Sequence, residues 1–357
     1  MTSKITPNTF LTTTGSSSAS DQKTTIFFIS GNPGLIRYYH PFLSLLSRYL
    51  DENKDKTSSN LLPQFQIYGS SLGGFEIPED GSSASSPPRS TNGIDLEDQI
   101  RFVQGKLSAL VEDNNSKYKY QSQDGIDKEK EKKPKQKIIL IGHSVGAYIA
   151  MEILRRHREA ATSPTGESES DFDIIGGVML FPTIQDIASS PSGQKLTSLL
   201  SIIPRLAVVV GFFARLLTSL LPRSLLRALV GFVMRYPPAH ALDATCAFLM
   251  SPGGVRQALH MAADEMRTIT SDKWSDDVWG AASTGQLVAK LFFYFGRNDH
   301  WVADQTRDDV IAARGRKDGE MGPTMVVCEE SLPHAFCLNH NDVMARKVAG
   351  MIRQIVG

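Results

Sequence analysis

An apolar run at residues 138–141 leads into a Gly-x-Ser-x-Gly motif, and residues of helical character follow at 147–151. The motif consists of Gly142, His143, Ser144, Val145 and Gly146. A serine on a tight turn between a strand and a helix holds its hydroxyl above the edge of a sheet, in the arrangement known as a nucleophile elbow. The two glycines let strand and helix pass closely and tolerate the strained turn. A structural glycine turn is the alternative interpretation, but the strand and helix on either side favour the elbow.

A nucleophilic serine on this turn needs an acid and then a histidine further along the chain. Asp299 comes just after an aromatic, strand-like run at residues 291–295. His334 follows the next apolar run, residues 325–328, and precedes a predicted C-terminal helix. Ser144, Asp299 and His334 are therefore expected at the ends of successive strands, on one rim of a sheet.

Other residues of the right chemical type are weaker candidates. His300 is too close in sequence to Asp299, and His340 lies at the start of the C-terminal helix, where a capping or surface role is expected. The remaining acids, which we expect to form a solvated charge pair or a helix cap, are Glu329, Glu330 and Asp304.

A turn at residues 30–34, after a strand-like run, offers backbone donors for an oxyanion. With an elbow of this kind, one donor is the N–H that follows the nucleophile, here Val145, and the second comes from a loop after another strand. Asn32 is the expected second donor, because Pro33 has no N–H. The alternatives left open are Gly34 and Leu35.

Length and charge bound the classes of function. The 357 residues are enough for a full core, and 38 basic residues balance 38 acidic ones, so no global field favours nucleic acid. Three cysteines, at positions 246, 328 and 337, show no metal-ligand spacing and cannot all pair. We therefore expect a reduced, cytosolic setting without a metal site. The N-terminal residues lack the pattern of a secretion signal.

Polar segments divide the chain. Residues 1–22 are predicted to be a disordered tail, and residues 23–357 to form one domain. Within it, residues 78–92 and 113–136 are predicted to be flexible polar insertions, because they cannot bury enough apolar area to offset the cost of ordering. Residues 94–111 carry apolar side chains at helical spacing and are predicted to form the helix before the elbow strand.

Residues 196–236 form a hydrophobic insertion, in a stretch without acidic residues from Asp186 to Asp243. Pro204 and Pro222 bracket its most apolar part, which predicts two short helices with a break. The insertion contains five arginines, Arg205, Arg215, Arg223, Arg227 and Arg235. The last three are spaced by multiples of four and are predicted to share one helix face, opposite Leu225, Leu226, Leu229, Phe232 and Val233.

Three interpretations of this insertion compete. A transmembrane helix needs about 20 apolar residues, but the apolar piece is shorter and holds Arg215 near its centre, at a cost of roughly 2.5–3.5 kcal/mol. A buried cap is the simplest alternative. A lid that also lies in a phospholipid monolayer explains the arginines better, because their heads can reach lipid phosphates. The residues expected at the lipid surface are Leu206, Val209, Phe212, Phe213, Arg215, Leu217, Arg223, Arg227 and Arg235.

Several segments together resemble the lipid-droplet-associated hydrolases. They are residues 31–34 with 38–43, 96–100, 142–148, 180–184 with 190–193, and 332–336. The resemblance extends from about residue 24 to the C-terminus, apart from the polar insertions. It implies an α/β-hydrolase fold, with Ser144, Asp299 and His334 as the triad. It also implies residence on lipid droplets and esterase activity on sterol esters or triacylglycerols.

The fold expected from all of these features is a mostly parallel central sheet with flanking helices and an inserted hydrophobic lid. The expected protein is a serine ester hydrolase without a metal or organic cofactor. Its expected partners are a neutral-lipid ester and the phospholipid surface of lipid droplets or of the cytosolic face of the endoplasmic reticulum, and not nucleic acid. The alternatives are a droplet-organising protein with a vestigial triad, and a thioesterase or acyltransferase with the same triad. The sequence does not predict the oligomeric state.

Overall fold

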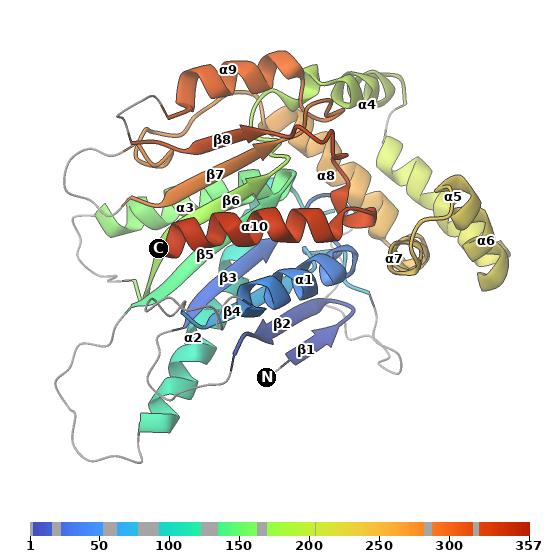
Figure 1. Cartoon of the computed structure of the whole chain (residues 1–357). Helices are drawn as coiled ribbons and strands as arrows, with labels where there is room; N and C mark the ends of the chain where they lie inside the picture. The colour runs from blue at the N-terminus through green and yellow to red at the C-terminus, as the bar shows by residue number, and fades with distance from the viewer. Residues whose placement is uncertain are drawn as a thin grey trace.

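The computed structural model describes residues 3–15, 23–52, 63–77, 93–122, 135–162, 170–203, 205–281, 288–316 and 321–357, with the side chains of 118–122 left out. These residues include an eight-stranded sheet in the order β1-β2-β4-β3-β5-β6-β7-β8 (Figure 1). The strands are β1 (Ser3–Thr6), β2 (Thr9–Thr13), β3 (Thr24–Ile29), β4 (Phe65–Ser70), β5 (Gln136–His143), β6 (Phe172–Leu180), β7 (Lys290–Phe295) and β8 (Thr324–Val327). All pairs from β4 to β8 are parallel, and only β1 and β2 run antiparallel to their neighbours. The mostly parallel α/β sheet expected from the sequence is confirmed.

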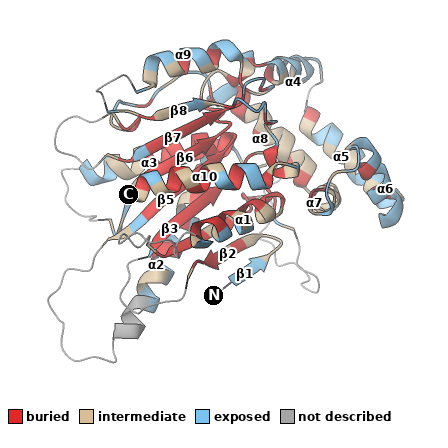
Figure 2. Ribbon diagram, viewed as in Figure 1, coloured by how far each residue is buried: buried red, intermediate tan, exposed pale blue. Residues whose placement is uncertain are grey.

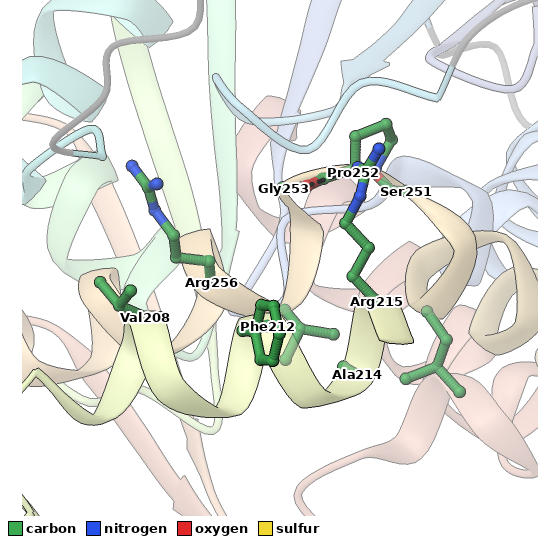
Figure 3. A pocket seen from close by; sticks show the side chains of 11 residues that line it. Val208, Phe212, Ala214, Arg215, Ser251, Pro252, Gly253 and Arg256 are labelled. Atoms are coloured by element: carbon green, nitrogen blue, oxygen red, sulfur yellow. Dashed lines mark hydrogen bonds between the residues drawn. The ribbon is translucent and has the colours of Figure 1, made fainter. Parts of the chain in front are cut away.

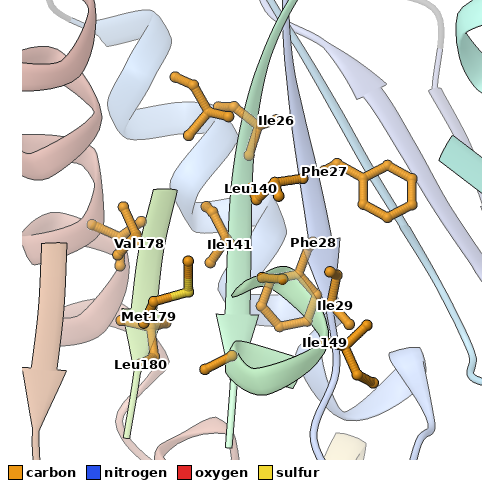
Figure 4. Packing of buried hydrophobic residues seen from close by; sticks show 14 of the residues in the cluster. Ile26, Phe27, Phe28, Ile29, Leu140, Ile141, Ile149, Val178, Met179 and Leu180 are labelled. Carbon is orange, nitrogen blue, oxygen red and sulfur yellow. The ribbon is translucent and has the colours of Figure 1, made fainter. Parts of the chain in front are cut away.

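Helices cover both faces of the sheet, so its central strands are buried on both sides (Figure 2). The helices that flank the sheet include η1 (Ile36–Tyr39), α1 (His40–Asp51), α2 (Leu96–Ser122), α3 (Val145–Thr162), α9 (Asp304–Arg314), η4 (Phe336–Leu338) and α10 (Asn341–Val356). Every residue of β3 is buried, which explains why residues 26–29 of the strand are all apolar and do not alternate with polar ones. Phe28 of β3 lies opposite Ile141 of β5, which lies opposite Val178 of β6, and all three belong to the buried core (Figure 4).

The N-terminal segment differs from the prediction of a disordered tail over residues 1–22. β1 and β2 form a hairpin, and β2 extends the sheet by pairing with β4. The physical reason is the alternation in β2, where Phe10 is 1% exposed and packs on His40 with ring centroids 5.8 Å apart. Threonine suits a strand as well as a solvated tail, so the polar composition concealed this pattern. The prediction is wrong for residues 3–15, and residues 1–2 and 16–22 lie outside the described part.

The helix before the elbow strand is longer than predicted. α2 continues to Ser122, past the predicted end at residue 111 and into the predicted polar insertion. Asn114 ties this extension to the sheet, because its Nδ2 donates to Gln66 at 2.8 Å and to Gln136 at 3.2 Å. Lys117 pairs with Asp113 one turn earlier, which supports an exposed helix. The last residue of that insertion, Gln136, begins β5. Residues 123–134 and the insertion 78–92 lie outside the described residues.

A cap follows β6 and lies beyond the carboxyl ends of the strands (Figure 1). It consists of η3 (Ile187–Ser189), α4 (Pro191–Ile202), α5 (Leu206–Leu220), α6 (Arg223–Val233), α7 (Ala239–Met250) and α8 (Gly254–Thr268). Pro222 stands at the break between α5 and α6, whereas Pro204 lies outside the described residues. No single helix in the described ranges is long and apolar enough to cross a membrane, although α4 and α5, bent by 93°, together meet that length and composition.

The predicted arginine face of this region is only partly correct. α6 ends at Val233, and Arg235 follows with a positive φ of 57°. Arg235 therefore does not continue the helix face that carries Arg223 and Arg227. The opposite face is also divided. Leu226 is buried, whereas the other four residues predicted for that face are exposed: Leu225, Leu229, Phe232 and Val233.

Candidate active site

Ser144 stands at the junction of β5 and α3, with a φ of 56° in the left-handed region. Its N–H donates to the carbonyl of Leu180 at 2.9 Å, which holds the turn against β6. A Cβ added to Gly142 would lie 2.3 Å from the oxygen of Gly146, and one added to Gly146 would lie 2.4 Å from the oxygen of Ile29. The two glycines are therefore required by close backbone contacts on both sides of the serine.

The structure brings Ser144, His334 and Asp299 into one hydrogen-bonded chain. Ser144 Oγ is 2.9 Å from His334 Nε2, and His334 Nδ1 is 2.9 and 2.7 Å from the two oxygens of Asp299. A carboxylate only accepts, so Nδ1 carries the proton and Nε2 accepts the serine hydroxyl. Asp299 is buried, and the N–H of Trp301 donates to it at 2.8 Å. This second donor fixes the carboxylate toward the imidazole.

The alternative acids and histidines have other surroundings. Glu330 pairs with Lys347 at 2.6 Å, and this hydrogen bond holds the pKa of Glu330 below its usual value. Asp304 is the first residue of α9 and pairs with Arg307. His340 precedes α10, in the capping position expected for it. None of these contacts involves the serine.

The N–H of Val145 begins α3, so it belongs to the first turn, where backbone donors have no acceptor within the helix. A helix N-terminus also favours negative charge. The loop after β3 passes directly beside Ser144, because a Cβ on Gly31 would lie 3.0 Å from the Cβ of Ser144. Leu35 was one of the alternative oxyanion donors, but its N–H already donates to the oxygen of Pro33 at 2.9 Å. Asn32 stays the predicted second donor.

Glu265, on α8, is a buried neighbour of this loop that the sequence analysis missed. Its Oε1 accepts from Asn32 Nδ2 at 3.0 Å, and the same nitrogen donates to the oxygen of Ala258 at 2.9 Å. Burial raises the pKa of Glu265 to about 8, although the bond from Asn32 opposes the shift. The sequence held one indication that Glu265 is buried. It lies four residues from Met261 and four from Ile269, a helical spacing that places it on the apolar face.

The cap carries a shallow groove of about 190 Å³ between α5 and the turn that joins α7 to α8 (Figure 3). Val208, Phe212 and Arg215 line it from α5, and Pro252 and Arg256 line it from the other side. No residue of the serine–histidine–aspartate chain lines the groove. It therefore belongs to the cap surface and does not mark the position of the reacting bond.

The predicted lipid-surface residues are mostly exposed on α5 and α6 (Figure 2). Phe212 and Phe213 are 62% and 61% exposed. Leu206 is the exception, because it is 2% exposed and packs inside the cap. Arg227 pairs with Asp243 of α7, so its charge is partly neutralised within the protein. The other predicted surface residues with exposed side chains are Val209, Arg215, Leu217, Arg223 and Arg235.

The described residues contain no group of histidine, cysteine and acidic side chains that is arranged to hold a metal ion. The three cysteines are free, and Cys328 and Cys337 are buried.

With this geometry in place, comparison with known proteins shows the family. The model of the lipid-droplet-associated hydrolases matches residues 22–337. The chain belongs to the lipid-droplet-associated hydrolase family. The lipid droplet-associated hydrolase of Gallus gallus is 27% identical over 91% of this chain and 83% of its own length. That of Mus musculus is 26% identical over 93% of this chain and 86% of its own length. The resemblance drawn from the sequence motifs is confirmed.

The fold of this lipid-droplet-associated hydrolase family member is also found in solved structures. The haloalkane dehalogenase DbeA from Bradyrhizobium elkani is similar with a TM-score of 0.52 and 13% identity, over 99% of this chain and 97% of that one. At this identity the likeness concerns the fold alone. It agrees with the sheet order and the elbow, and the chain has the α/β-hydrolase fold expected for a hydrolase.

Proposed function

We propose that this protein is a serine hydrolase that cleaves carboxylic esters of neutral lipids at a lipid surface. The observation that carries the proposal is the continuous chain from Ser144 Oγ through His334 to Asp299, with each contact between 2.7 and 2.9 Å. Nucleophile, base and orienting acid are all within the reach that triad catalysis needs. An intact chain of this kind supports catalysis rather than a vestigial triad.

The proposed reaction follows from which atoms can give and take protons. Ser144 Oγ attacks the ester carbonyl carbon while His334 Nε2 takes its proton. Asp299 stabilises the resulting imidazolium. The N–H groups of Val145 and Asn32 stabilise the negative oxygen of the tetrahedral intermediate. His334 then protonates the leaving alcohol, and water, activated by the same nitrogen, releases the acid from the acyl-enzyme.

The cap supports a lipid surface as the place of action. Phe212, Phe213, Leu220, Phe232 and Val233 are all more than half exposed on α5 and α6. Apolar side chains gathered on two neighbouring helices are uncommon on a monomer and indicate a binding surface. Relatives are named for association with lipid droplets, and we extend this location to the present chain.

Arginines lie beside these apolar side chains. Arg215 and Arg223 are exposed, and each carries its charge on a long stem that can reach from an apolar layer to lipid phosphates. We propose that α5 and α6 rest in the phospholipid monolayer of a droplet, or on the cytosolic face of the endoplasmic reticulum, without crossing it. The sheet and its active site then stay in water next to the lipid.

Product analysis on a panel of emulsified esters tests the proposed reaction. The panel contains sterol esters, triacylglycerols and short-chain esters, each incubated with wild-type protein and with the Ser144→Ala variant. Release of free fatty acid by the wild type only is expected. A parallel incubation with an added alcohol or thiol acceptor separates hydrolysis from acyl transfer, since a transferase would give a new ester or thioester instead of the acid.

A further inference from the structure

His143, the residue before the nucleophile, is 4% exposed and lies among aromatic rings. Its ring centroid is 5.1 Å from those of His334 and Phe336 and 5.6 Å from that of Tyr39. Burial lowers the pKa of His143 well below its usual value, and the neighbouring His334 lowers it further. The imidazole is therefore neutral near pH 7, with one N–H donor and one acceptor nitrogen.

The partners of His143 decide which nitrogen carries the proton. Nε2 is 2.9 Å from the backbone oxygen of His334, which only accepts, so Nε2 donates. Nδ1 is then the acceptor, and it receives the hydroxyl proton of Tyr39 at 2.8 Å. The Tyr39 oxygen in turn accepts from the N–H of Gly31 at 3.2 Å. The donors and acceptors follow one direction, from Gly31 to Tyr39 to His143 to His334.

This chain of bonds joins the three backbone segments that carry the site. Gly31 precedes the expected oxyanion donor Asn32, His143 precedes Ser144, and His334 bears the base. A misplacement of 1 Å in such a site costs about 10²-fold in rate. Apolar side chains would fill the same space without the cost of burying polar groups. The buried polar pair is therefore better explained by orientation than by packing.

We propose that His143 and Tyr39 are positioning residues that hold the general base and the oxyanion loop in register with the nucleophile. The inference rests on the serine hydrolase function proposed above. Neither side chain touches the reacting atoms. His143 acts through the backbone of His334, and Tyr39 acts through His143 and Gly31.

Two neighbouring tyrosines provide a matched test. Tyr38 and Tyr39 are both buried in η1, and each loses one hydroxyl on substitution by phenylalanine. The Tyr38 hydroxyl instead contacts Thr245 Oγ1 in α7, at 2.8 Å. Tyr39→Phe removes the hydroxyl bonds to His143 and Gly31, and we expect it to slow fluorophosphonate labelling of Ser144 and kcat by at least about tenfold, with KM nearly unchanged. Tyr38→Phe should stay within about twofold of wild type.

A second pair of variants separates orientation from volume. In His143→Gln the amide can donate to His334 and accept from Tyr39, whereas the side chain of His143→Leu fills the space without either bond. We expect about a 100-fold loss of labelling rate for His143→Leu and recovery of most of it for His143→Gln. Thermal unfolding of each variant identifies those that are folded. If His143→Leu does not fold, the tyrosine pair still decides the question.

The outcomes separate the two proposals. Rapid labelling of wild-type Ser144, with equal rates for Tyr39→Phe and Tyr38→Phe, would overturn the positioning role and leave the serine hydrolase intact. Equal losses of labelling rate in folded His143→Leu and His143→Gln would also overturn the positioning role and leave the serine hydrolase intact. Absence of wild-type labelling would remove the proposed function and the positioning role together. Selective loss in Tyr39→Phe with recovery in His143→Gln supports both.

Discussion

Gly31 and Ser144 approach so closely that a methyl group on Gly31 would lie 3.0 Å from the serine Cβ, with the side-chain nitrogen of His143 at the same distance. The loop after β3 and the elbow after β5 are adjacent because their strands are neighbours in parallel register, with Ile29 opposite Gly142. A parallel sheet thus places the expected oxyanion loop beside Ser144, the proposed nucleophile.

Gly31→Ala is expected to lower kcat by tenfold or more, because the added methyl moves the oxyanion loop away from Ser144 by a few tenths of an ångström. Steady-state kinetics on a soluble ester measures the change. Gly105→Ala is the matched control, since nothing lies within 4 Å of a Cβ there and α2 gains helix propensity of about 1 kcal/mol. A control that loses as much activity as Gly31→Ala would refute the steric argument.

Asp299→Asn is expected to lower turnover by roughly 10⁴-fold, because the amide can donate to His334 and stabilise the wrong tautomer. Folding should be nearly unchanged, since the two side chains have the same shape. Glu330→Gln is the control, because Glu330 pairs with Lys347 instead. A large loss in Glu330→Gln with an active Asp299→Asn would show that the acid is misassigned.

Replacing Phe212, Phe213 and Leu217 by Ser should release a tagged protein from lipid droplets, because the exposed apolar surface of α5 is lost. Droplet flotation with fluorescence imaging measures the release, and short-ester hydrolysis should persist. Met321→Ser with Val343→Ser is the control, since both residues are exposed and apolar but lie outside the cap. Unchanged droplet enrichment of the α5 variant would make the cap an internal lid only.

Reversal of Arg223 and Arg235 to Glu should weaken attachment as well, by about 1 kcal/mol for each charge near an anionic surface. Vesicle co-sedimentation at low and high salt measures the effect, which should shrink as salt screens the charges. Arg227 is left unchanged, because it pairs with Asp243 within the cap. Equal binding of the variant at low salt would exclude an electrostatic contribution from these two residues.

Glu265→Gln should make stability less sensitive to pH. The folded protein keeps the Glu265 proton up to a pKa of about 8, whereas the unfolded chain loses it near 4.5. Between these values the wild type loses up to about 1.4 kcal/mol of stability per pH unit as pH rises, and the neutral amide does not. Urea unfolding at pH 6 and pH 9 should therefore show a growing advantage of the variant at the higher pH.

Glu152→Gln is the control with the opposite sign. Burial raises the pKa of Glu152, but hydrogen bonds from Arg155 and Trp274 and the charge of Lys273 lower it below its usual value overall. Its carboxylate stabilises the fold above pH 4.5 and loses that contribution as pH falls. Glu152→Gln should therefore lower stability at pH 7. A Glu265→Gln variant that behaves in the same way would show that Glu265 is charged in the folded protein.

The sequence predicted those parts of the site that depend on strand ends. Ser144, Asp299 and His334 each follow an apolar run, and a parallel sheet brings the ends of such runs to one edge. The resemblance to the lipid-droplet-associated hydrolases in turn predicted the α/β-hydrolase fold. Asn32 was expected as an oxyanion donor from its place after a strand. Its loop passes beside Ser144, and the donor role stays a prediction.

Features that depend on contacts across the chain could not be predicted. Glu265 meets Asn32 from a helix more than 200 residues away, and one acid on an apolar helix face has no local signal of its partner. Tyr39 and His143 are connected in the same way, over 104 residues. The N-terminal hairpin was missed because threonine-rich strands resemble polar tails. Arg235 was wrongly placed on the face of α6, because the helix ends at Val233 and Arg235 has a positive φ that the sequence does not reveal.

The most direct test of the account is labelling of the purified protein with a fluorophosphonate, followed by mass spectrometry of the modified peptide. We expect one adduct, on Ser144, that is absent in Ser144→Ala and strongly slowed in Asp299→Asn. Labelling of another serine with the same rate in all three proteins, or no labelling of a folded wild type, would contradict the assignment of Ser144 as the nucleophile.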